Sequence, residues 1–361
     1  MKRIAITSTI EKLANEFKKE MLYVKPIHHE ISKACTQLAI LCDNFDHGWI
    51  AMEVKNSNGE IIYPARSSED LKNYITKIKT EYENLLILHP SNFSEKISEF
   101  NRIIPTEEIC KIKIKRNPNG DKEEWLHELI VKKMRYNYVQ SKIFPKYIRL
   151  MGIKTCVYCN SQYAITTRSD ESLYQLDHCM PKSRYPYLST SFFNLQPCCS
   201  SCNLWKSDND ILYGNYSPSI WRELDEPDED YFLFKIKEDA LTQYLLTRDK
   251  DDIAIELVIK GNALDELVSL HNDYQNYFKI DALYSEHKDV IEEILWKQYV
   301  YSNSYIKSLR SAFKSINKVN LDFSRFIMGN YMNKDDVFKR PLSKLVQDIA
   351  SQLHISLEQS E

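Results

Sequence analysis

Glycine is scarce in this chain, with 7 residues among 361, while tyrosine occurs 23 times. A sequence that is poor in glycine and rich in tyrosine, lysine and glutamate is typical of a largely helical fold. Apolar residues make up 43% of the chain, which is enough for several hydrophobic cores. The length predicts two or three domains rather than one.

The sequence also lacks a long apolar run and an excess of charge. No stretch of about 18 apolar residues occurs, which argues against a membrane span, and the N-terminus does not resemble a signal peptide. We therefore expect a cytoplasmic protein whose nine cysteines serve metal binding or core packing rather than disulfides. Because the net charge is −3, a nucleic acid would have to be bound by a local basic patch or through another protein.

Hydrophobic periodicity and composition divide the chain into four regions. In order, these are an N-terminal helical region, a basic arm with a helix, a segment that holds the chemistry, and a C-terminal helical region: residues 1–105, 106–155, 156–215 and 216–361. The alternation of lysine and isoleucine over residues 111–115 predicts a strand or an extended arm. A long helix is expected from about residue 123 towards residue 150, with a break before Pro145 as the alternative. In the last region, residues 231–236 and 241–247 have strand-like patterns.

Two Cys-x-x-Cys pairs mark the third region. They consist of Cys156 with Cys159 and of Cys199 with Cys202, and each pair brings two sulfurs close enough to share one ion. Four thiolates satisfy a closed tetrahedral Zn²⁺ site, which would hold the two ends of the intervening segment together. Cys198 could replace Cys199, although the resulting spacing is less regular. Reduced core cysteines and a redox pair are the alternatives, but packing rarely produces two such pairs and a thioredoxin-like site needs only one.

Between the cysteine pairs the sequence predicts a strand–loop–strand–helix unit. One predicted strand ends at Asp177-His178, a second follows at residues 194–197, and a helix begins at residue 202. Phosphodiester hydrolysis needs a base that activates water, and a histidine with a pKa near neutrality suits that task. It also needs a hard cation, held by carboxylate and amide oxygens, that neutralises the charge on the phosphate.

One set of residues in this segment resembles the HNH, or ββα-metal, endonuclease family in its zinc-binding version. The matching run is Asp177-His178, Pro181-Lys182-Ser183, Asn194-Leu195 and Cys199-x-x-Cys202-Asn203-x-x-Lys206. The resemblance covers residues 150–210 and rests on several elements in the right order. It implies a mainly helical protein with a small ββα-metal nuclease module, stapled by structural zinc on Cys156, Cys159, Cys199 and Cys202.

The resemblance also implies a role for each catalytic position. His178 would be the general base, and Asp177 would be a ligand of a catalytic Mg²⁺ or Mn²⁺. Asn194 would fix the loop and orient the ring of His178. Asn203 stands where many relatives have a second metal ligand, histidine or asparagine. Because asparagine is a weak ligand, an aspartate at position 208 or 210 could compensate.

Positive side chains around this segment are expected to contact phosphate. Within the motif they are Lys182, Arg184 and Lys206. Upstream, residues 111–154 contain twelve basic and four acidic residues with aromatics interleaved, a pattern that is typical of a surface that tracks a phosphate backbone. Lys132, Lys133 and Arg135 are its expected DNA contacts, and a solvated helical face is the alternative interpretation.

These observations predict a metal-dependent endonuclease that acts on DNA. The long loop after His178 and the helical extension are similar to HNH proteins of Septu-type and retron antiphage systems. That resemblance implies a role in antiviral defence together with an ABC/SMC-like ATPase partner. One alternative is a non-catalytic zinc-dependent module that binds nucleic acid or protein, although it would not need the acid–base residues. The other is a stand-alone restriction-type enzyme, for which the sequence shows no helix-turn-helix or finger array.

Overall fold

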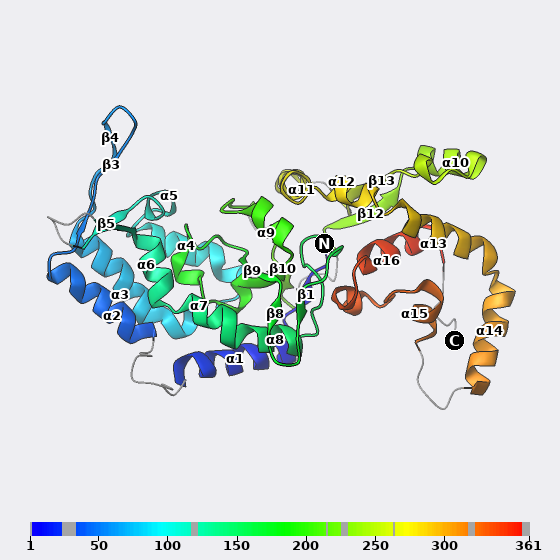
Figure 1. Ribbon diagram of the computed structural model, residues 1–361, viewed down its shortest axis with the longest axis horizontal. Helices are drawn as coiled ribbons and strands as arrows, with labels where there is room; N and C mark the ends of the chain where they lie inside the picture. Colours follow the sequence, from blue (N-terminus) through cyan, green and yellow to red (C-terminus); the bar gives the residue numbers. More distant parts are fainter. Residues whose placement is uncertain are drawn as a thin grey trace.

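The computed structural model of the chain describes residues 2–23, 34–116, 122–213, 216–224, 230–262, 264–316 and 322–355. Within these ranges the protein is mainly helical, with small sheets of two or three strands, as the sequence predicts. Figure 1 shows the N-terminal and C-terminal helices at opposite ends of the molecule, with the cysteine-containing segment between them. No helix in the described ranges is long and apolar enough to cross a membrane.

The N-terminal region is built from amphipathic helices. Their bounds are α1 (Ser8–Tyr23), α2 (Ala34–Asp46), α3 (Ser68–Leu85), α4 (Phe93–Asn101) and α5 (Thr106–Ile109). Helix α3 begins after Ser67, whose side chain accepts a hydrogen bond from the backbone N–H of Asp70. Its apolar side chains recur at helical spacing and are all buried, so this helix forms much of the local core.

The basic arm contains the predicted strand but not one long helix. Strand β5 (Lys113–Lys115) pairs with β2 (Ile50–Ala51) on one side and β6 (Glu123–Trp125) on the other. Residues 123–125 are therefore strand, and the helical part is divided into α6 (Leu126–Lys133), α7 (Tyr136–Tyr138), a π-helical turn (Val139–Ile143) and α8 (Phe144–Leu150). Arg135 ends α6 because its φ of 65° is left-handed, and Pro145 lacks the N–H that a continuous helix would use.

Two further hairpins precede the central pair of strands. A turn at Asn58-Gly59 joins β3 (Val54–Lys55) to β4 (Ile61–Tyr63), with Gly59 at a φ of 82°. Strand β7 (Ile165–Thr166) pairs with β8 (Ser172–Leu173) in the second hairpin.

The central pair consists of β9 (Gln175–His178) and β10 (Leu195–Cys198), which run antiparallel. Helix α9 (Ser200–Lys206) follows β10 directly. The register places Leu195 opposite His178 and Gln196 opposite Asp177. The strand–loop–strand–helix order predicted for this segment is therefore present.

An aromatic cluster fixes the loop between β9 and β10 against the N-terminal helices. Phe192, in that loop, lies 5.6 Å from the ring of Phe17 on α1 and 5.5 Å from the ring of Phe144 on α8, measured between centroids. All three side chains are fully buried. Burying rings of this size contributes a large share of the local hydrophobic stabilisation, so the loop has a fixed support.

The C-terminal region combines one hairpin with helices. Strands β12 (Phe232–Ile236) and β13 (Ile255–Ile259) pair antiparallel, and β1 (Ile4–Ala5) pairs with β11 (Trp221–Arg222) in parallel. Residues 241–247 are not a strand, because they belong to α10 (Glu238–Thr247), whose first turn carries two acids that favour a helix N-terminus. The remaining helices are α11 (Asp265–Phe278), α12 (Ile280–Ser285), α13 (Lys288–Val300), α14 (Asn303–Ile316), α15 (Phe323–Met328) and α16 (Ser343–Gln352).

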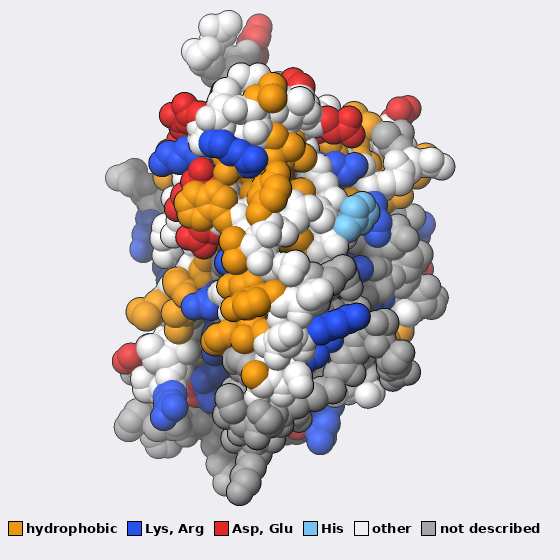
Figure 2. All heavy atoms as spheres, turned by 90° about the vertical axis from the view of Figure 1, so that its right-hand side faces the viewer, with side chains coloured by type: hydrophobic (Ala, Val, Ile, Leu, Met, Phe, Trp, Pro, Cys, Tyr) orange, Lys and Arg blue, Asp and Glu red, His pale blue; other side chains and the backbone are white. Residues whose placement is uncertain are grey.

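Hydrophobic side chains are exposed on the outer face of this region. Figure 2 shows them gathered into a continuous band on the side of the molecule formed by the C-terminal helices. The large exposed apolar residues of these helices include Leu246 on α10, Trp296, Tyr299 and Val300 on α13, and Phe326 on α15.

Asn160 joins the cysteine segment to the far end of the chain. Its Nδ2 donates to the carbonyl of Val337 at 2.9 Å, and its Oδ1 accepts from the backbone N–H of Lys344 at 3.0 Å. The backbone N–H of Leu342 donates to the Asn160 carbonyl at 2.7 Å. The C-terminal helices are thus fastened to the cysteine segment by hydrogen bonds that are buried.

Candidate functional site

The four cysteines of the two pairs meet in one cluster. The sulfurs of Cys156, Cys159, Cys199 and Cys202 all lie within 4.8 Å of one another. Tetrahedral zinc with bonds of about 2.3 Å requires sulfurs separated by about 3.8 Å, so the cluster fits such an ion after minor adjustment. Cys198 lies outside it and donates to the carbonyl of Gln175 at 3.6 Å, which confirms the choice of Cys199.

The close approach of the four sulfurs makes the ionisation of each thiol depend on the others. Contacts with Cys156 lower the pKa values of Cys159 and Cys199, whereas the contact with Cys156 raises the pKa of Cys202. Burial raises the pKa of Cys156 itself. Four thiolates packed so closely would repel one another, and a bound dication removes that repulsion. The cluster is a candidate metal centre.

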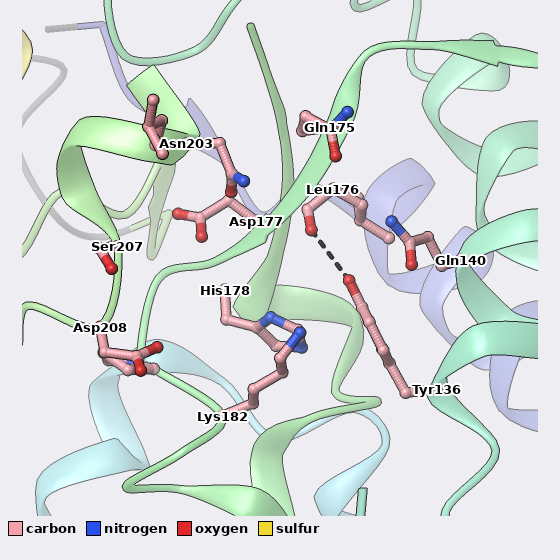
Figure 3. A pocket seen from close by; sticks show the side chains of 12 residues that line it. Tyr136, Gln140, Gln175, Leu176, Asp177, His178, Lys182, Asn203, Ser207 and Asp208 are labelled. Atoms are coloured by element: carbon pink, nitrogen blue, oxygen red, sulfur yellow. Dashed lines mark hydrogen bonds between the residues drawn. The ribbon is translucent and has the colours of Figure 1, made fainter. Parts of the chain in front are cut away.

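A cavity of about 290 Å³ opens beside this cluster, at the end of β9. Figure 3 shows Asp177, His178, Asn203 and Asp208 around one space, with Lys182 beside the imidazole. The lining is Tyr136, Gln140, Gln175, Leu176, Asp177, His178, Pro181, Lys182, Asn203, Leu204, Ser207 and Asp208. The structure therefore brings the predicted base and both predicted ligands of the divalent ion to one cavity.

His178 lies at the end of β9 and is only 4% exposed. Its Nε2 lies 2.9 Å from the carbonyl oxygen of Ser189. Because a carbonyl can only accept, Nε2 carries the proton and Nδ1 keeps its lone pair. Burial, with a smaller contribution from Lys182, lowers the pKa of His178 to about 3. The ring is thus neutral rather than titrating near neutrality, contrary to the sequence expectation.

Asp177 is held through one of its two carboxylate oxygens. Its Oδ2 accepts a hydrogen bond from the hydroxyl of Tyr158 and lies 3.2 Å from Nζ of Lys206. Within the described part of the chain, no hydrogen bond reaches Oδ1. Figure 3 shows the carboxylate next to the side chain of Asn203, so an oxygen is available on the cavity side.

Lys206 does not contact phosphate, contrary to the expectation from the sequence. Its side chain is fully buried, and Nζ donates to the carbonyl of His178 at 2.7 Å besides pairing with Asp177. A cation enclosed in this way cannot reach a phosphate at the surface. Lys206 instead neutralises Asp177 and fixes the end of β9.

Arg184 is also engaged elsewhere. Its Nη1 lies 3.6 Å from Glu107 and 3.8 Å from Asp210, and it does not line the cavity. Asp210 in turn accepts from the hydroxyl of Tyr185, so of the two aspartates expected to compensate for Asn203 only Asp208 faces the cavity. Lys182 is the expected phosphate contact that does line the cavity, with Nζ 4.7 Å from the ring centroid of Tyr136.

Asn194 fixes the loop as expected but does not touch the imidazole. Its Oδ1 accepts from the N–H of Met180 at 2.7 Å, and its Nδ2 donates to the carbonyls of Met180 and Leu188 at 3.1 and 3.0 Å. The ring of His178 is oriented by the neighbouring carbonyl of Ser189. Asn194 therefore acts on the histidine only through the loop.

The basic arm is less positive than its composition indicates. Ion pairs join Lys113 to Glu123, Arg116 to Glu124, Lys146 to Glu20 and Arg149 to Asp170. Of the three expected DNA contacts, Lys133 donates to Gln37 at 3.0 Å and Arg135 lies 4.3 Å above the ring of Tyr138, while Lys132 is exposed. Only part of the surplus charge is free to meet a phosphate backbone.

Three contributors to the site were not predicted. Tyr136 and Gln140 line the cavity, and Tyr158 holds Asp177. The sole sequence signal for any of them is the position of Tyr158 between two cysteines.

Comparisons of the chain with protein-family models, with curated proteins and with solved structures found no match. The functional argument therefore depends on the geometry.

Proposed function

We propose that this protein is a divalent-metal-dependent endonuclease of the HNH type that hydrolyses phosphodiester bonds in DNA. The observation that carries the proposal is the buried His178, whose Nε2 lies 2.9 Å from the carbonyl oxygen of Ser189, in a cavity shared with Asp177 and Asn203. The β9–β10–α9 arrangement around that cavity supports the same interpretation. Four cysteines, which suit structural zinc, hold the segment together.

The imidazole of His178 is placed to accept a proton from water. Its Nε2–H is committed to Ser189, so the proton must be taken up at Nδ1. The low pKa keeps the ring unprotonated at neutral pH but makes it a weak base. A phosphodiester in the cavity brings a negative charge near the ring, which raises that pKa and strengthens the base.

Asp177 and Asn203 offer the oxygens that a hard cation prefers. Among the described residues, the cysteines are the only group of three or more His, Cys, Asp or Glu side chains close enough to hold an ion. The cavity thus offers few protein ligands for a hard cation. Asp177 and Asn203, with Asp208 across the cavity, would hold Mg²⁺ or Mn²⁺, and water and phosphate oxygens would complete the coordination. When bound, that ion would neutralise the phosphate and stabilise the leaving 3′ oxygen.

Cleavage of plasmid DNA tests the proposal. Purified protein is incubated with Mg²⁺, Mn²⁺ or EDTA, and wild type is compared with His178→Ala. Loss of the base should slow cleavage by about 10²–10⁴-fold, and EDTA should abolish it. His271→Ala is the matched control, because its Nε2 also bonds a backbone carbonyl, that of Leu257 at 2.7 Å, and it does not line the cavity.

Two outcomes would count against the nuclease. One is equal activity of wild type and His178→Ala. The other is inactivity of both, even when the ATPase partner is added. The proposed role in antiphage defence and the proposed ATPase partner extend the same hypothesis.

A further inference from the structure

Tyr158 links the two candidate metal centres, the cysteine cluster and the cavity that contains Asp177. Its backbone lies between Cys156 and Cys159, so its position follows from the turn that presents those two sulfurs. Its hydroxyl donates to Oδ2 of Asp177 in the neighbouring cavity. One side chain thus connects the cysteine cluster with the carboxylate expected to hold the divalent ion.

The packing around Tyr158 leaves its side chain no alternative position. The residue is fully buried, and its ring stacks on Phe278 of α11, with centroids 4.4 Å apart and planes inclined by 15°. Its carbonyl accepts from the hydroxyl of Tyr274 at 3.0 Å, and its own hydroxyl accepts from Nε2 of Gln196 at 2.8 Å. The side chain is packed so tightly that it cannot reorient independently of its backbone. A shift of the cysteine turn therefore moves the hydroxyl of Tyr158 as well.

The hydroxyl and Lys206 together determine how Asp177 faces the cavity. Both act on Oδ2, and Lys206 is anchored in addition to the carbonyl of His178 at 2.7 Å. Oδ1 is therefore the oxygen left for a cation, on a carboxylate that lies beside Asn203 in Figure 3. Without the hydroxyl, Lys206 alone would hold Oδ2, and the carboxylate could rotate about its Cβ–Cγ bond.

We infer that Tyr158 is a positioning residue that couples the two metal centres. With an ion on the four cysteines, the turn is rigid and Asp177 is oriented for the divalent ion. With the cysteines empty, the turn relaxes and the affinity for the divalent ion falls. The inference rests on the proposed function, because it takes Asp177 as a ligand of that ion. Groups that orient a metal ligand typically change metal affinity by about 10–100-fold when removed.

The test measures Mn²⁺ affinity rather than cleavage. Every protein is full length and carries His178→Ala, so that a short DNA duplex can be present without being cut. Free Mn²⁺ is followed by electron paramagnetic resonance, with the duplex alone as the blank, and zinc content is measured by elemental analysis. Tyr158→Phe is compared with Tyr147→Phe, a buried control whose hydroxyl donates to the carboxylate of Glu20 at 2.8 Å, and neither Tyr147 nor Glu20 belongs to the cysteine cluster or the cavity lining.

The parent is the protein that carries His178→Ala alone. We expect Tyr158→Phe to retain its zinc and to bind Mn²⁺ about tenfold more weakly than the parent, while Tyr147→Phe has the Mn²⁺ affinity of the parent. Removing zinc from the parent should weaken Mn²⁺ binding by a similar factor, and it should have little further effect in Tyr158→Phe. The coupling is overturned if Tyr158→Phe keeps both zinc and the parental Mn²⁺ affinity. It is also overturned if zinc removal weakens Mn²⁺ binding equally in both proteins.

The parent also gives an answer alone, should Tyr158→Phe fold poorly. Mn²⁺ affinity that does not change on zinc removal refutes the coupling while the nuclease assignment stands. Absence of Mn²⁺ binding beyond the duplex blank refutes the ion site itself, and the coupling with it.

Discussion

His178 is an imidazole whose neutral form is stabilised by the fold. Burial lowers its pKa to about 3, whereas an unfolded histidine titrates near 6.5. Between these values the unfolded chain binds a proton that the folded chain does not, so the free energy of unfolding rises with pH. The contribution of His178 is therefore complete above about pH 6.5 and is lost as the pH falls towards 3.

The resulting prediction concerns stability rather than catalysis. Denaturant unfolding of wild type between pH 3.5 and 7.5 should show a slope from this residue of up to about 1.4 kcal/mol per pH unit. His178→Gln, which cannot titrate, should have a shallower dependence. Parallel curves for the two proteins would show that the ring is not held neutral.

The residues of the site divide into those that spacing reveals and those that only packing reveals. The cysteine cluster follows from two Cys-x-x-Cys pairs, and the meeting of Asp177, His178 and Asn203 follows from a motif within one short segment. Lys206 was assigned to phosphate because a lysine is usually exposed, but here the fold buries it against Asp177. Tyr158 was missed because a contact across nineteen residues leaves no periodic signal.

At the scale of elements, periodicity predicts the long amphipathic helices but not the interruptions. The buried stripes of α3, α11 and α16 coincide with the apolar spacing in the sequence. The break at Arg135 was not predicted, because a left-handed residue that is neither glycine nor asparagine has no compositional signal. The strand-like pattern of residues 241–247 was overridden by a helix of which only Tyr244 is buried.

The unit formed by β9, β10 and α9 depends on the cysteines at its ends. We predict that Cys156→Ser combined with Cys202→Ser abolishes metal binding and lowers the free energy of unfolding, because the binding free energy of a structural zinc adds to that of folding. Zinc analysis together with denaturant unfolding measures both effects. Cys198→Ser is the matched control, since Cys198 is a buried neighbour outside the cluster. A double variant as stable as wild type would rule out a structural ion.

At the scale of the whole molecule, the distribution of charge decides where DNA is expected to bind. Lys182 lines the cavity, whereas several cations of the basic arm are paired with carboxylates. We predict that Lys182→Glu weakens DNA binding at every sequence and reduces the salt dependence by about one phosphate contact. Fluorescence anisotropy between 50 and 200 mM salt, in the His178→Ala background, measures both quantities.

The DNA binding of Lys182→Glu is compared with that of a triple variant, Lys132→Glu, Lys133→Glu and Arg135→Glu. If the basic arm tracks the phosphate backbone, this variant binds more weakly and with a flatter salt dependence. Binding equal to that of the parent would remove the arm from the DNA-binding surface and leave the cavity rim as the contact.

Asn160 has a consequence for how such a protein can change over evolutionary time. Its hydrogen bonds join the residue after Cys159 to residues 337–344, across nearly half the chain. Its φ of 52° is a strained position whose cost is offset by those partners. A recombination event that moved residues 150–210 into another protein would transfer the motif but leave Asn160 without them. The motif and the C-terminal helices are therefore expected to be inherited together, as one unit.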